Sequence, residues 1–431
     1  MTRFLYITYY WPPSAGAGVQ RGVKFVKYLR RMGLEPIVIT VDPESASYPG
    51  RDDSLVKEIP GDVRVVRTRS FEPLRLLARL AGNKAVPQAG FASGAQAGWG
   101  ARAMRWVRGN WLIPDARRGW VTYALKAAGK IIEEEDVRCV VISSPPHSSQ
   151  LIGPALKRRF PKLRWISDLR DPWTDIYFAR ELHQGERAER INAAHEAAVM
   201  NGADALVVVG PSMERALAER YGPTVARKIT VIPNGYDAED MQLVRDVCPP
   251  GDRFRVTYVG SMAGSYRPEC FFRSMRRVAA MLDRTLELRF VGPVGLEVRE
   301  LARQIGVEQW CTWLDPVPHD EALKEMAAAH VLLLVIPEAP GDERILTGKL
   351  FEYVGVGVPV LGVGPPQGDA AVVLRECGAG RMFARDEEQA MVEWVHAVYQ
   401  GRNVMHRDER AQAAYERSVQ AARLADVIRG E

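Results

Sequence analysis

Short apolar runs alternate with helical patterns along almost the whole of this 431-residue chain. Such alternation is typical of parallel strands joined by helical crossovers, and it restricts the chain to the α/β class. The predicted strands form two series. The first comprises residues 4–8, 36–41, 63–67, 138–143, 164–167, 205–209 and 229–232, and the second comprises 254–259, 286–291, 311–314, 331–336 and 358–363.

The two series are separated by a segment that is rich in turn-forming residues, 233–252, which contains Asn234-Gly235 and Pro249-Pro250-Gly251. We therefore predict two Rossmann-like, doubly wound domains, residues 1–240 and 241–407, that face each other across a cleft. Ligands of such sheets bind at the carboxyl ends of the strands. Residues 408–431 are charged and helical in pattern, and they could pack back across the first domain.

Composition narrows the class of protein further. A net charge of +5, with 47% hydrophobic and 26% charged residues, describes an ordinary globular chain that leans weakly toward anionic ligands. The five cysteines are scattered, which predicts reduced thiols in a cytoplasmic protein and no structural zinc. Since no apolar run approaches 18 residues, neither export nor a membrane span is expected.

Residues 70–120 depart from the alternation. Between residues 63 and 120 there are eleven basic residues and two acidic ones, interleaved with Trp99, Trp106, Trp111 and Trp120. A basic insertion that carries tryptophans suits contact with an anionic membrane surface or a lipid acceptor. The alternative is a solvated helical hairpin. Nucleic-acid binding is not expected, because the surrounding α/β units are compact.

The segment that begins Thr347-Gly348-Lys349-Leu350 predicts a phosphate site. It is typical of a turn that carries a lysine into the N-terminus of a helix, where anions bind. Glu352 lies three positions beyond Lys349, so that both can face one ligand. A cation for a diphosphate beside an acceptor for ribose hydroxyls indicates a nucleotide-sugar.

A second group of candidates follows the strand 254–259. Gly260-Ser261 ends this strand, and Arg267 stands before Pro268, a residue suited to the first position of a helix. Arg267 would then lie at the positive end of that helix and hold the diphosphate together with Lys349. A plain surface arginine is the alternative.

Acceptor-side candidates follow strands of the first half. Gly16 and Gly18 allow backbone N–H groups to approach a ligand, or else form a simple turn. His147 follows a strand and is expected to point into the cleft, with a packing or capping role as the alternative. Asp168 and Asp171 could hold acceptor hydroxyls, orient Arg170 or cap a helix.

Six motifs in order carry a resemblance that covers most of the chain. They are the loop 9–21, Ser143-Ser144-Pro145-Pro146-His147, Asp168-Leu169-Arg170-Asp171-Pro172-Trp173, Ile232-Pro233-Asn234-Gly235-Tyr236-Asp237, Tyr258-Val259-Gly260-Ser261 and the stretch 348–361. Together they resemble GT-B glycosyltransferases of the family-4-like group, which are common in bacterial polysaccharide and glycoconjugate assembly.

The resemblance implies an activity and further site residues. It implies retaining, metal-independent transfer of a hexose from a nucleotide-diphosphate sugar, most often of UDP and next of GDP, to a hydroxyl of a lipid-linked or polysaccharide precursor. His147 would contact the transferred sugar. The base would lie against the backbone near Leu314 and Val317.

Two positions depart from the family pattern. Many members carry a glutamate eight positions before the Glu352 position, whereas this chain has Arg344 there, with Glu343 one place away. Many members also carry an arginine where this chain has Ser261. The first departure leaves open the usual contact of the first glutamate with the donor sugar. The second leaves two alternatives: Arg267 and Lys349 hold the phosphates alone, or another basic residue compensates.

The predicted chemistry needs no cofactor. Cleavage of the anomeric bond develops negative charge on the departing diphosphate, which the predicted catalytic groups Lys349 and Arg267 would stabilise. The chain has no D-x-D pair to hold a divalent metal. Three alternatives remain: a nucleotide-sugar epimerase, a nicotinamide oxidoreductase and an inactive sugar-nucleotide-binding protein. Arg21, which stands where G-x-G-x-x-G requires its third glycine, disfavours the oxidoreductase.

Overall fold

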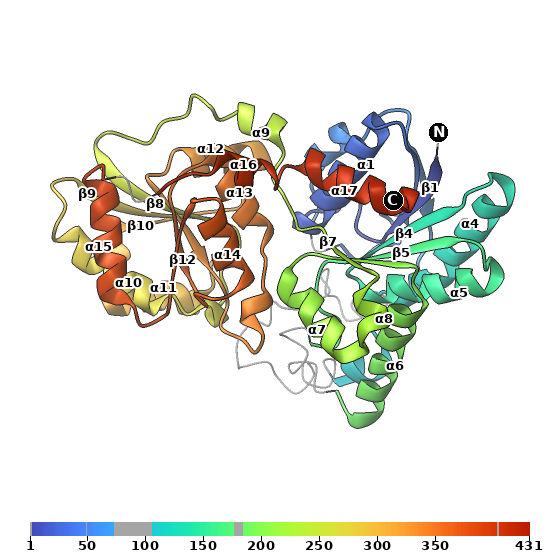
Figure 1. The fold of residues 1–431 in the computed structure, drawn as a ribbon. Helices are drawn as coiled ribbons and strands as arrows, with labels where there is room; N and C mark the ends of the chain where they lie inside the picture. The colour runs from blue at the N-terminus through green and yellow to red at the C-terminus, as the bar shows by residue number, and fades with distance from the viewer. Residues whose placement is uncertain (1, 49, 73–105, 176–183, 403–404) are drawn as a thin grey trace. The chain divides into compact units, whose positions relative to one another are not determined.

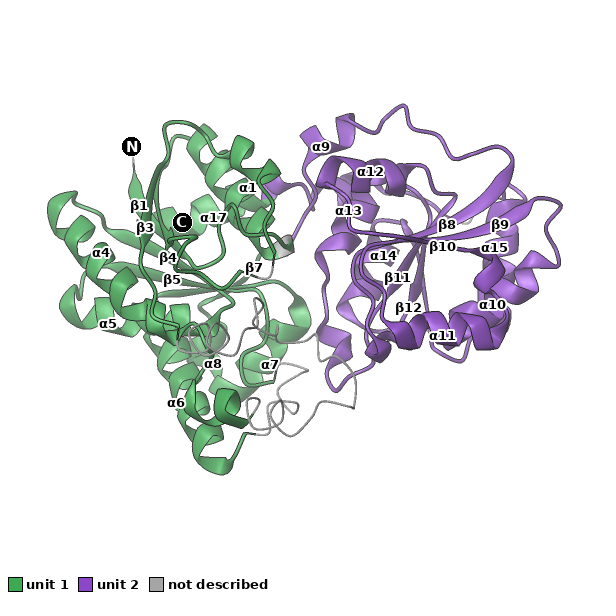
Figure 2. Ribbon diagram, turned by 180° about the vertical axis from the view of Figure 1, so that it is seen from behind, with its two compact units in different colours: residues 1–233, 420–431 green, residues 234–419 purple. Residues whose placement is uncertain are grey.

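Two parallel sheets organise the chain, and each belongs to its own compact unit (Figure 1). The computed structural model describes residues 2–48, 50–72, 106–175, 184–402 and 405–431. Unit 1 consists of Met1–Pro233 and Gln420–Glu431, and unit 2 consists of Asn234–Val419 (Figure 2). The boundary between Pro233 and Asn234 lies at the beginning of the turn-rich segment 233–252.

The sheet of unit 1 has seven strands in the order β3-β2-β1-β4-β5-β6-β7, and every neighbouring pair is parallel. The strands are β1 (Arg3–Thr8), β2 (Glu35–Val41), β3 (Arg64–Thr68), β4 (Cys139–Ser144), β5 (Arg164–Leu169), β6 (Ala205–Val208) and β7 (Ile229–Val231). The helices are α1 (Ala17–Arg31), α4 (Val121–Glu134), α5 (Ile152–Arg159), α6 (Glu186–Gly202), α7 (Pro211–Tyr221), α8 (Pro223–Ala226) and α17 (Arg417–Arg429).

Both faces of this sheet are covered by helices, because successive strand residues point to opposite sides. Phe4 and Tyr6 of β1 pack in a core cluster with residues of α1 and α17. Leu5 and Ile7 pack on the other face with residues of α4 and α5. The last residues of the chain therefore complete the core of the sheet that the first residues begin.

The sheet of unit 2 has six parallel strands in the order β10-β9-β8-β11-β12-β13. The strands are β8 (Arg253–Val259), β9 (Thr285–Val291), β10 (Cys311–Leu314), β11 (Val331–Val335), β12 (Val360–Val363) and β13 (Gly380–Phe383). The helices are α9 (Ala238–Gln242), α10 (Glu269–Ala279), α11 (Leu296–Ile305), α12 (His319–Ala327), α13 (Gly348–Val356), α14 (Asp369–Glu376), α15 (Glu388–Tyr399) and α16 (Glu409–Ala413).

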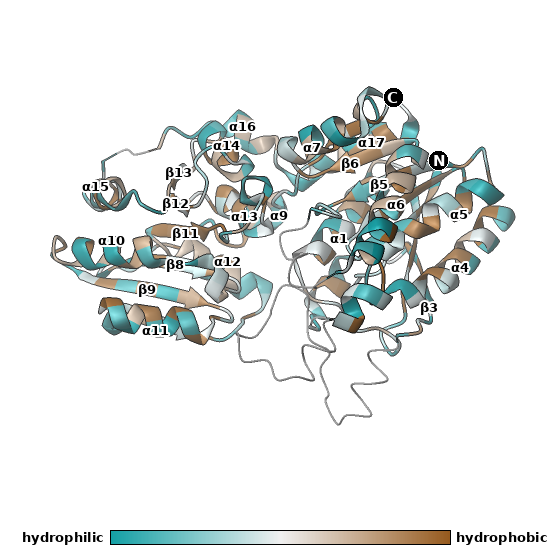
Figure 3. Cartoon of the chain, turned by 90° about the horizontal axis from the view of Figure 1, so that it is seen from below, coloured by the Kyte–Doolittle hydropathy of each residue, from teal (hydrophilic) through white to brown (hydrophobic). Residues whose placement is uncertain are grey.

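Residues of β11 alternate in the same way. Leu333 packs with residues of α10, α11 and α15, whereas Leu332 and Leu334 pack with residues of α12, α13 and α14. Figure 3 shows the hydropathy that goes with such burial: in unit 1, β6 is largely hydrophobic, and in unit 2, α10 and α11 carry both hydrophobic and hydrophilic residues. An apolar strand between amphipathic helices is what burial of a parallel sheet on both faces requires.

The α/β class and the twelve predicted strands are confirmed, with strand ends that differ by a residue or two. The thirteenth strand, β13, was not predicted, because Gly380 and Arg381 interrupt its short apolar run. Among the described residues, no helix is both long and apolar enough to cross a bilayer.

Most of the predicted basic insertion 70–120 lies outside the described residues, since residues 73–105 are not among them. In the described part, the side chains of Trp106 and Trp111 are exposed. Trp120 is buried, and its Nε1 donates a hydrogen bond of 2.8 Å to Thr68 Oγ1. Trp120 therefore serves the core of unit 1, and the membrane contact of the insertion stays a prediction.

Candidate functional site

In unit 2, the predicted phosphate residues meet where β8 ends and α13 begins. Lys349 Nζ lies 2.6 Å from Tyr258 Oη and 4.0 Å from the centre of the Tyr258 ring. A Cβ atom on residue 260 would lie 2.9 Å from Nζ, and Gly260 has a φ of 116°. Only glycine therefore fits at the end of β8 with the lysine in this place.

The N-terminus of α13 presents polar groups that are not used by the helix itself. Thr347 is the N-cap residue, but its side chain makes no capping hydrogen bond. Its Oγ1 is buried and has no hydrogen-bond partner in the described part of the chain. The first turn contains Gly348 and no acidic residue. Together with the partial positive charge of a helix N-terminus, this arrangement suits an anion.

The protonation state of Lys349 is sensitive to a bound anion, because its side chain is desolvated. Desolvation of the ammonium group lowers the pKa of Lys349 to about 7, against the opposing effect of the nearby Glu352 carboxylate. A desolvated lysine favours its neutral form, and an anion beside it restores the charged form. A bound diphosphate would therefore raise this pKa.

The other predicted donor residues lie in the same unit, and their side chains have partners or core positions of their own. Glu352 Oε1 lies 2.9 Å from Nε2 of His319, the first residue of α12. Leu350 is buried in the apolar core. Leu314 and Val317 are partly buried against that core, and the Leu314 carbonyl accepts a hydrogen bond of 3.0 Å from Gly292 N.

Arg267 lies just before the N-terminus of α10, one position further from the helix than predicted. Its guanidinium is exposed and forms an ion pair of 2.8 Å with Glu338. The helix α10 begins at Glu269 with Pro268 as its N-cap, so that Arg267 precedes the cap and has a left-handed φ of 46°. Its charge is committed to Glu338, and an anion would have to compete for it.

Glu343 and Arg344 lie together in the short 3₁₀ helix η7 (Asp342–Arg344). Their side chains form an ion pair, with 3.2 Å between Arg344 Nε and Glu343 Oε1. Arg344, which stands at the position of the usual first glutamate, is therefore paired with the carboxylate of the adjacent Glu343.

In unit 1, one of the two predicted glycines after β1, Gly18, accommodates an arginine. Gly16 is the N-cap residue of α1 with a φ of 116°. A Cβ on residue 18 would lie 1.7 Å from Nη1 of Arg170, so that Gly18 leaves the space that this guanidinium occupies. Arg170 is held by the carbonyls of Ser144, at 3.0 Å from Nε, and Pro145, at 2.7 Å from Nη2.

His147 begins the 3₁₀ helix η3 (His147–Leu151) and stacks on Trp173, with 5.0 Å between ring centres. It is buried, and neither ring nitrogen has a hydrogen-bond partner within the described ranges. Burial lowers the pKa of His147, while the carboxylates of Asp171 and Asp115 act in the opposite direction. A neutral ring with an unused nitrogen can receive or donate a hydrogen bond of a ligand.

Asp168 is fully buried and is occupied by protein partners. Its carboxylate accepts hydrogen bonds from Arg21, at 2.9 Å, and from Ser143 Oγ, at 2.7 Å. Arg21 also donates to the carbonyls of Ile232 and Pro233. The prediction offered Arg170 as the arginine that Asp168 could orient. In the structure Asp168 instead pairs with Arg21, which joins α1 to the end of unit 1. Asp171, by contrast, is partly exposed.

Sequence reasoning did not identify Tyr258 and His319 as partners of the phosphate residues. Tyr258 lies inside an apolar strand pattern, where a tyrosine is expected to serve the core. His319 follows the predicted base-binding residues Leu314 and Val317, and its place in the sequence gives no sign of its contact with Glu352. The signal that could have revealed Arg170 as a partner of the glycine loop is Gly18, since a glycine in a first helical turn indicates close approach of another group.

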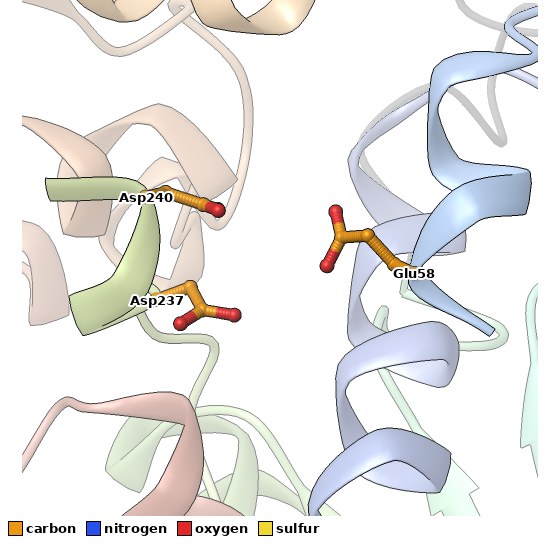
Figure 4. Close-up of side chains that lie close together, drawn as sticks. All are labelled: Glu58, Asp237 and Asp240. Carbon is orange, nitrogen blue, oxygen red and sulfur yellow. The ribbon is translucent and has the colours of Figure 1, made fainter. Parts of the chain in front are cut away.

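Carboxylates of Glu58, Asp237 and Asp240 are drawn in Figure 4, and two of them have clear roles within their own units. In unit 1, Glu58 pairs with Lys24 and Lys27 of α1. In unit 2, Asp237 is the N-cap residue of α9 and accepts from Glu239 N at 3.0 Å.

Unit 2 also contains a cavity of about 630 Å³ that lies away from the phosphate residues. Its lining includes Met241, Val244, His330 and Pro359. His330 and Pro359 directly precede β11 and β12, so that the cavity lies at the amino ends of the strands. Ligands of parallel sheets bind at the opposite ends, where Gly260 and Lys349 lie.

Comparisons with known proteins agree with this architecture. The model of Glycosyltransferase Family 4 matches residues 18–240. Sucrose-phosphate synthase of Thermosynechococcus elongatus is similar in structure, with a TM-score of 0.65 at 14% identity, covering 100% of this chain and 99% of that one. HepE of Anabaena, solved in complex with UDP and glucose, has a TM-score of 0.61 at 13% identity and covers 100% of both chains.

A putative UDP-N-acetylglucosamine 2-epimerase of Listeria monocytogenes has a TM-score of 0.57 at 14% identity, covering 99% of this chain and 96% of that one. A sequence search of curated proteins finds no match. At such identities the structural likeness shows the fold alone, which is GT-B: two Rossmann-like units, each built on a parallel sheet.

Proposed function

This chain belongs to Glycosyltransferase Family 4, and we propose that it transfers a hexose from a nucleotide-diphosphate sugar, with UDP as the leading base, to a hydroxyl acceptor. The acceptor is a lipid-linked or polysaccharide precursor, and the transfer retains the anomeric configuration. The observation that supports this function most is the position of Lys349, beside Gly260 and in the first turn of α13.

The reaction requires stabilisation of a leaving diphosphate. As the anomeric bond breaks, negative charge grows on the phosphate oxygens, and fixed donors that are already in place lower the barrier. Lys349 supplies a cation, and the N-terminus of α13 supplies a dipole and N–H groups. Thr347 Oγ1 is available to donate a further hydrogen bond. No metal ion or other cofactor is part of this proposal.

Arg267 has a secondary role in this scheme. Because its guanidinium pairs with Glu338, it reaches a phosphate only after that exposed ion pair opens. Exposed pairs of this kind contribute only about 0–1 kcal/mol, so the opening is inexpensive. Lys349 is therefore the principal cation in the donor site, and Glu352 is assigned to the ribose.

Unit 1 is assigned to the acceptor and the transferred sugar. His147 offers an unused ring nitrogen in a buried place, and Arg170 occupies the space beside Gly18 in the first turn of α1. Asp171 keeps an exposed part with which to meet a hydroxyl. Asp168 acts through Arg21 rather than on the acceptor, since its oxygens are buried and bonded.

A thermal-shift experiment tests the donor site. UDP- and GDP-sugars should raise the melting temperature of the wild-type protein, because a ligand that binds only the folded form stabilises it. Lys349→Ala should lose most of this shift and the sugar transfer with it. Lys324→Ala removes an exposed lysine of the same unit and should leave both unchanged.

Two outcomes would contradict the proposal. The assignment fails if Lys349→Ala retains the wild-type shift and transfer rate. Turnover of the donor to an epimeric nucleotide-sugar without any acceptor would indicate a nucleotide-sugar epimerase, an activity named for one of the structural relatives.

A further inference from the structure

Tyr258 connects Lys349 to the loop after β8, and the proposed reaction gives it no role. The tyrosine lies in β8, with its side chain 1% exposed. Its hydroxyl makes two hydrogen bonds of 2.6 Å, one with Lys349 Nζ and one with the carbonyl of Ser261, and it also meets the side chain of Tyr266. The strand, the loop that directly follows it and the start of α13, 91 positions further along the chain, thus meet at one oxygen atom.

The direction of both hydrogen bonds follows from the chemistry of the groups. A carbonyl oxygen can only accept, so that the single proton of the hydroxyl points at Ser261 O. The lone pairs that remain face Lys349, which must donate. Burial raises the pKa of Tyr258 well above its usual value, which keeps the phenol protonated. The hydroxyl is therefore a fixed acceptor for the ammonium group.

A lysine side chain without such a partner would sample many positions. Its four-carbon stem loses considerable rotamer entropy when it is held in one geometry. In unit 2 the stem is confined between Tyr258 and Gly260, where a Cβ atom would collide with Nζ. Ordering a binding group before the ligand arrives increases affinity because the ligand does not have to supply that entropy.

Resting on the proposed function, we infer that Tyr258 is a positioning residue: its hydroxyl, fixed by Ser261, holds the Lys349 ammonium group at the N-terminus of α13 to receive the donor diphosphate. Tyr258 does not itself touch the reacting atoms. Ser261, which stands where many relatives have an arginine, acts here through its carbonyl oxygen.

The other ionisable groups around Lys349 would not replace this hydroxyl. Glu352 on α13 favours the ammonium form through space, and it is in contact with His319 of α12. Burial raises the pKa values of Tyr266, on the loop after β8, and of Tyr353, on α13, so that both stay neutral. Removal of the Tyr258 hydroxyl should therefore make the ammonium form of Lys349 less favourable.

The test compares two tyrosine-to-phenylalanine variants by calorimetric titration with UDP and GDP between pH 6.5 and 8.5. Tyr258→Phe keeps the ring and removes the hydroxyl, and at pH 7.5 it should bind nucleotide about ten-fold more weakly. The pH at which its affinity begins to fall should also move downward. Tyr353→Phe is the matched control, since its hydroxyl is buried and accepts from Val259 N at 3.0 Å without meeting Lys349.

A second comparison separates positioning from general damage to the fold. In a Lys349→Ala background, Tyr258→Phe should cause almost no further loss, because the two side chains act as one unit. Equal losses in Tyr258→Phe and Tyr353→Phe, or an additive loss in the double variant, would overturn the inference. So would a Tyr258→Phe variant with wild-type affinity and an unchanged pH profile.

The same titrations distinguish this inference from the function on which it rests. If the wild-type protein binds nucleotide and Lys349→Ala binds it measurably but much more weakly, the donor site stands whatever Tyr258→Phe shows. A wild-type protein that binds neither UDP nor GDP would overturn the donor site and the role of Tyr258 together.

Discussion

At the residue scale, the donor site depends on one lysine whose charge is not fixed. Desolvation places the pKa of Lys349 at about 7, well below the usual value for a lysine. An exposed lysine stays protonated at any pH below about 10. Lys349, in contrast, exchanges its proton near neutral pH. Binding of an anion and uptake of a proton are therefore linked at this side chain.

The linkage predicts how nucleotide binding changes with pH. Below pH 7 Lys349 is already charged, and the affinity for UDP should depend little on this group. Above pH 7 the free protein loses the proton that the complex retains, so that affinity should fall by about ten-fold per pH unit up to the raised pKa of the complex. Calorimetry in buffers of different ionisation enthalpy would measure the proton taken up.

Lys349→Arg provides the control for this pH dependence. An arginine stays charged throughout the range, so that the variant should show no fall between pH 7 and 8, whatever its absolute affinity. A wild-type affinity that stays constant over the same interval would show that Lys349 binds UDP without exchanging a proton.

Single residues also mark the limit of what the sequence could predict. The Thr347-Gly348-Lys349 segment predicted a helix N-terminus with a lysine in its first turn, because local turn-forming residues determine where a helix begins. The partner of each charge could not be predicted in this way. Arg267 pairs with Glu338, 71 positions away, and Asp168 with Arg21, 147 positions away, and such pairs depend on the packing of whole elements.

At the scale of elements, strands were easier to predict than the starts of helices. Twelve strands followed from short apolar runs bounded by turn residues, because burial on both faces demands such runs. The start of α10 was expected at Pro268, and the structure begins it at Glu269. Proline fits either position, and only the left-handed turn at Arg267 decides between them.

The buried pair of Arg21 and Asp168 joins α1, β5 and the chain after β7, and its loss should destabilise unit 1. Asp168→Asn leaves the guanidinium of Arg21 buried without a counter-charge, at a cost of about 3–5 kcal/mol. For a unit of this size the melting temperature should fall by roughly 10 °C. Scanning calorimetry would measure the shift.

The matched control is Glu35→Gln, which removes the partner of Arg3 from an exposed pair of 3.2 Å. It should change stability by less than about 1 kcal/mol. Nucleotide binding should survive in both variants, because the donor residues belong to unit 2. If Asp168→Asn has the melting temperature of the wild type but loses acceptor-dependent turnover, the account is wrong and Asp168 contacts the acceptor.

At the scale of the whole molecule, the chain is a GT-B glycosyltransferase of two Rossmann-like units. The class was predictable because each unit repeats the same alternation of strand and helix. The sequence did not predict which residues of the tail pack on unit 1, because many helices have a charged, amphipathic pattern like that of the tail. The structure answers this through Leu424 and Ile428 of α17, which pack on the first sheet.

The central claim is that the start of α13 receives the diphosphate of a sugar donor, and a crystal structure of the complex with UDP tests it most directly. The account predicts phosphate oxygens within hydrogen-bond distance of Lys349 Nζ and of the N–H groups at Thr347 to Lys349. A diphosphate bound elsewhere on the protein, with Lys349 still on Tyr258 and no phosphate beside it, would contradict the claim.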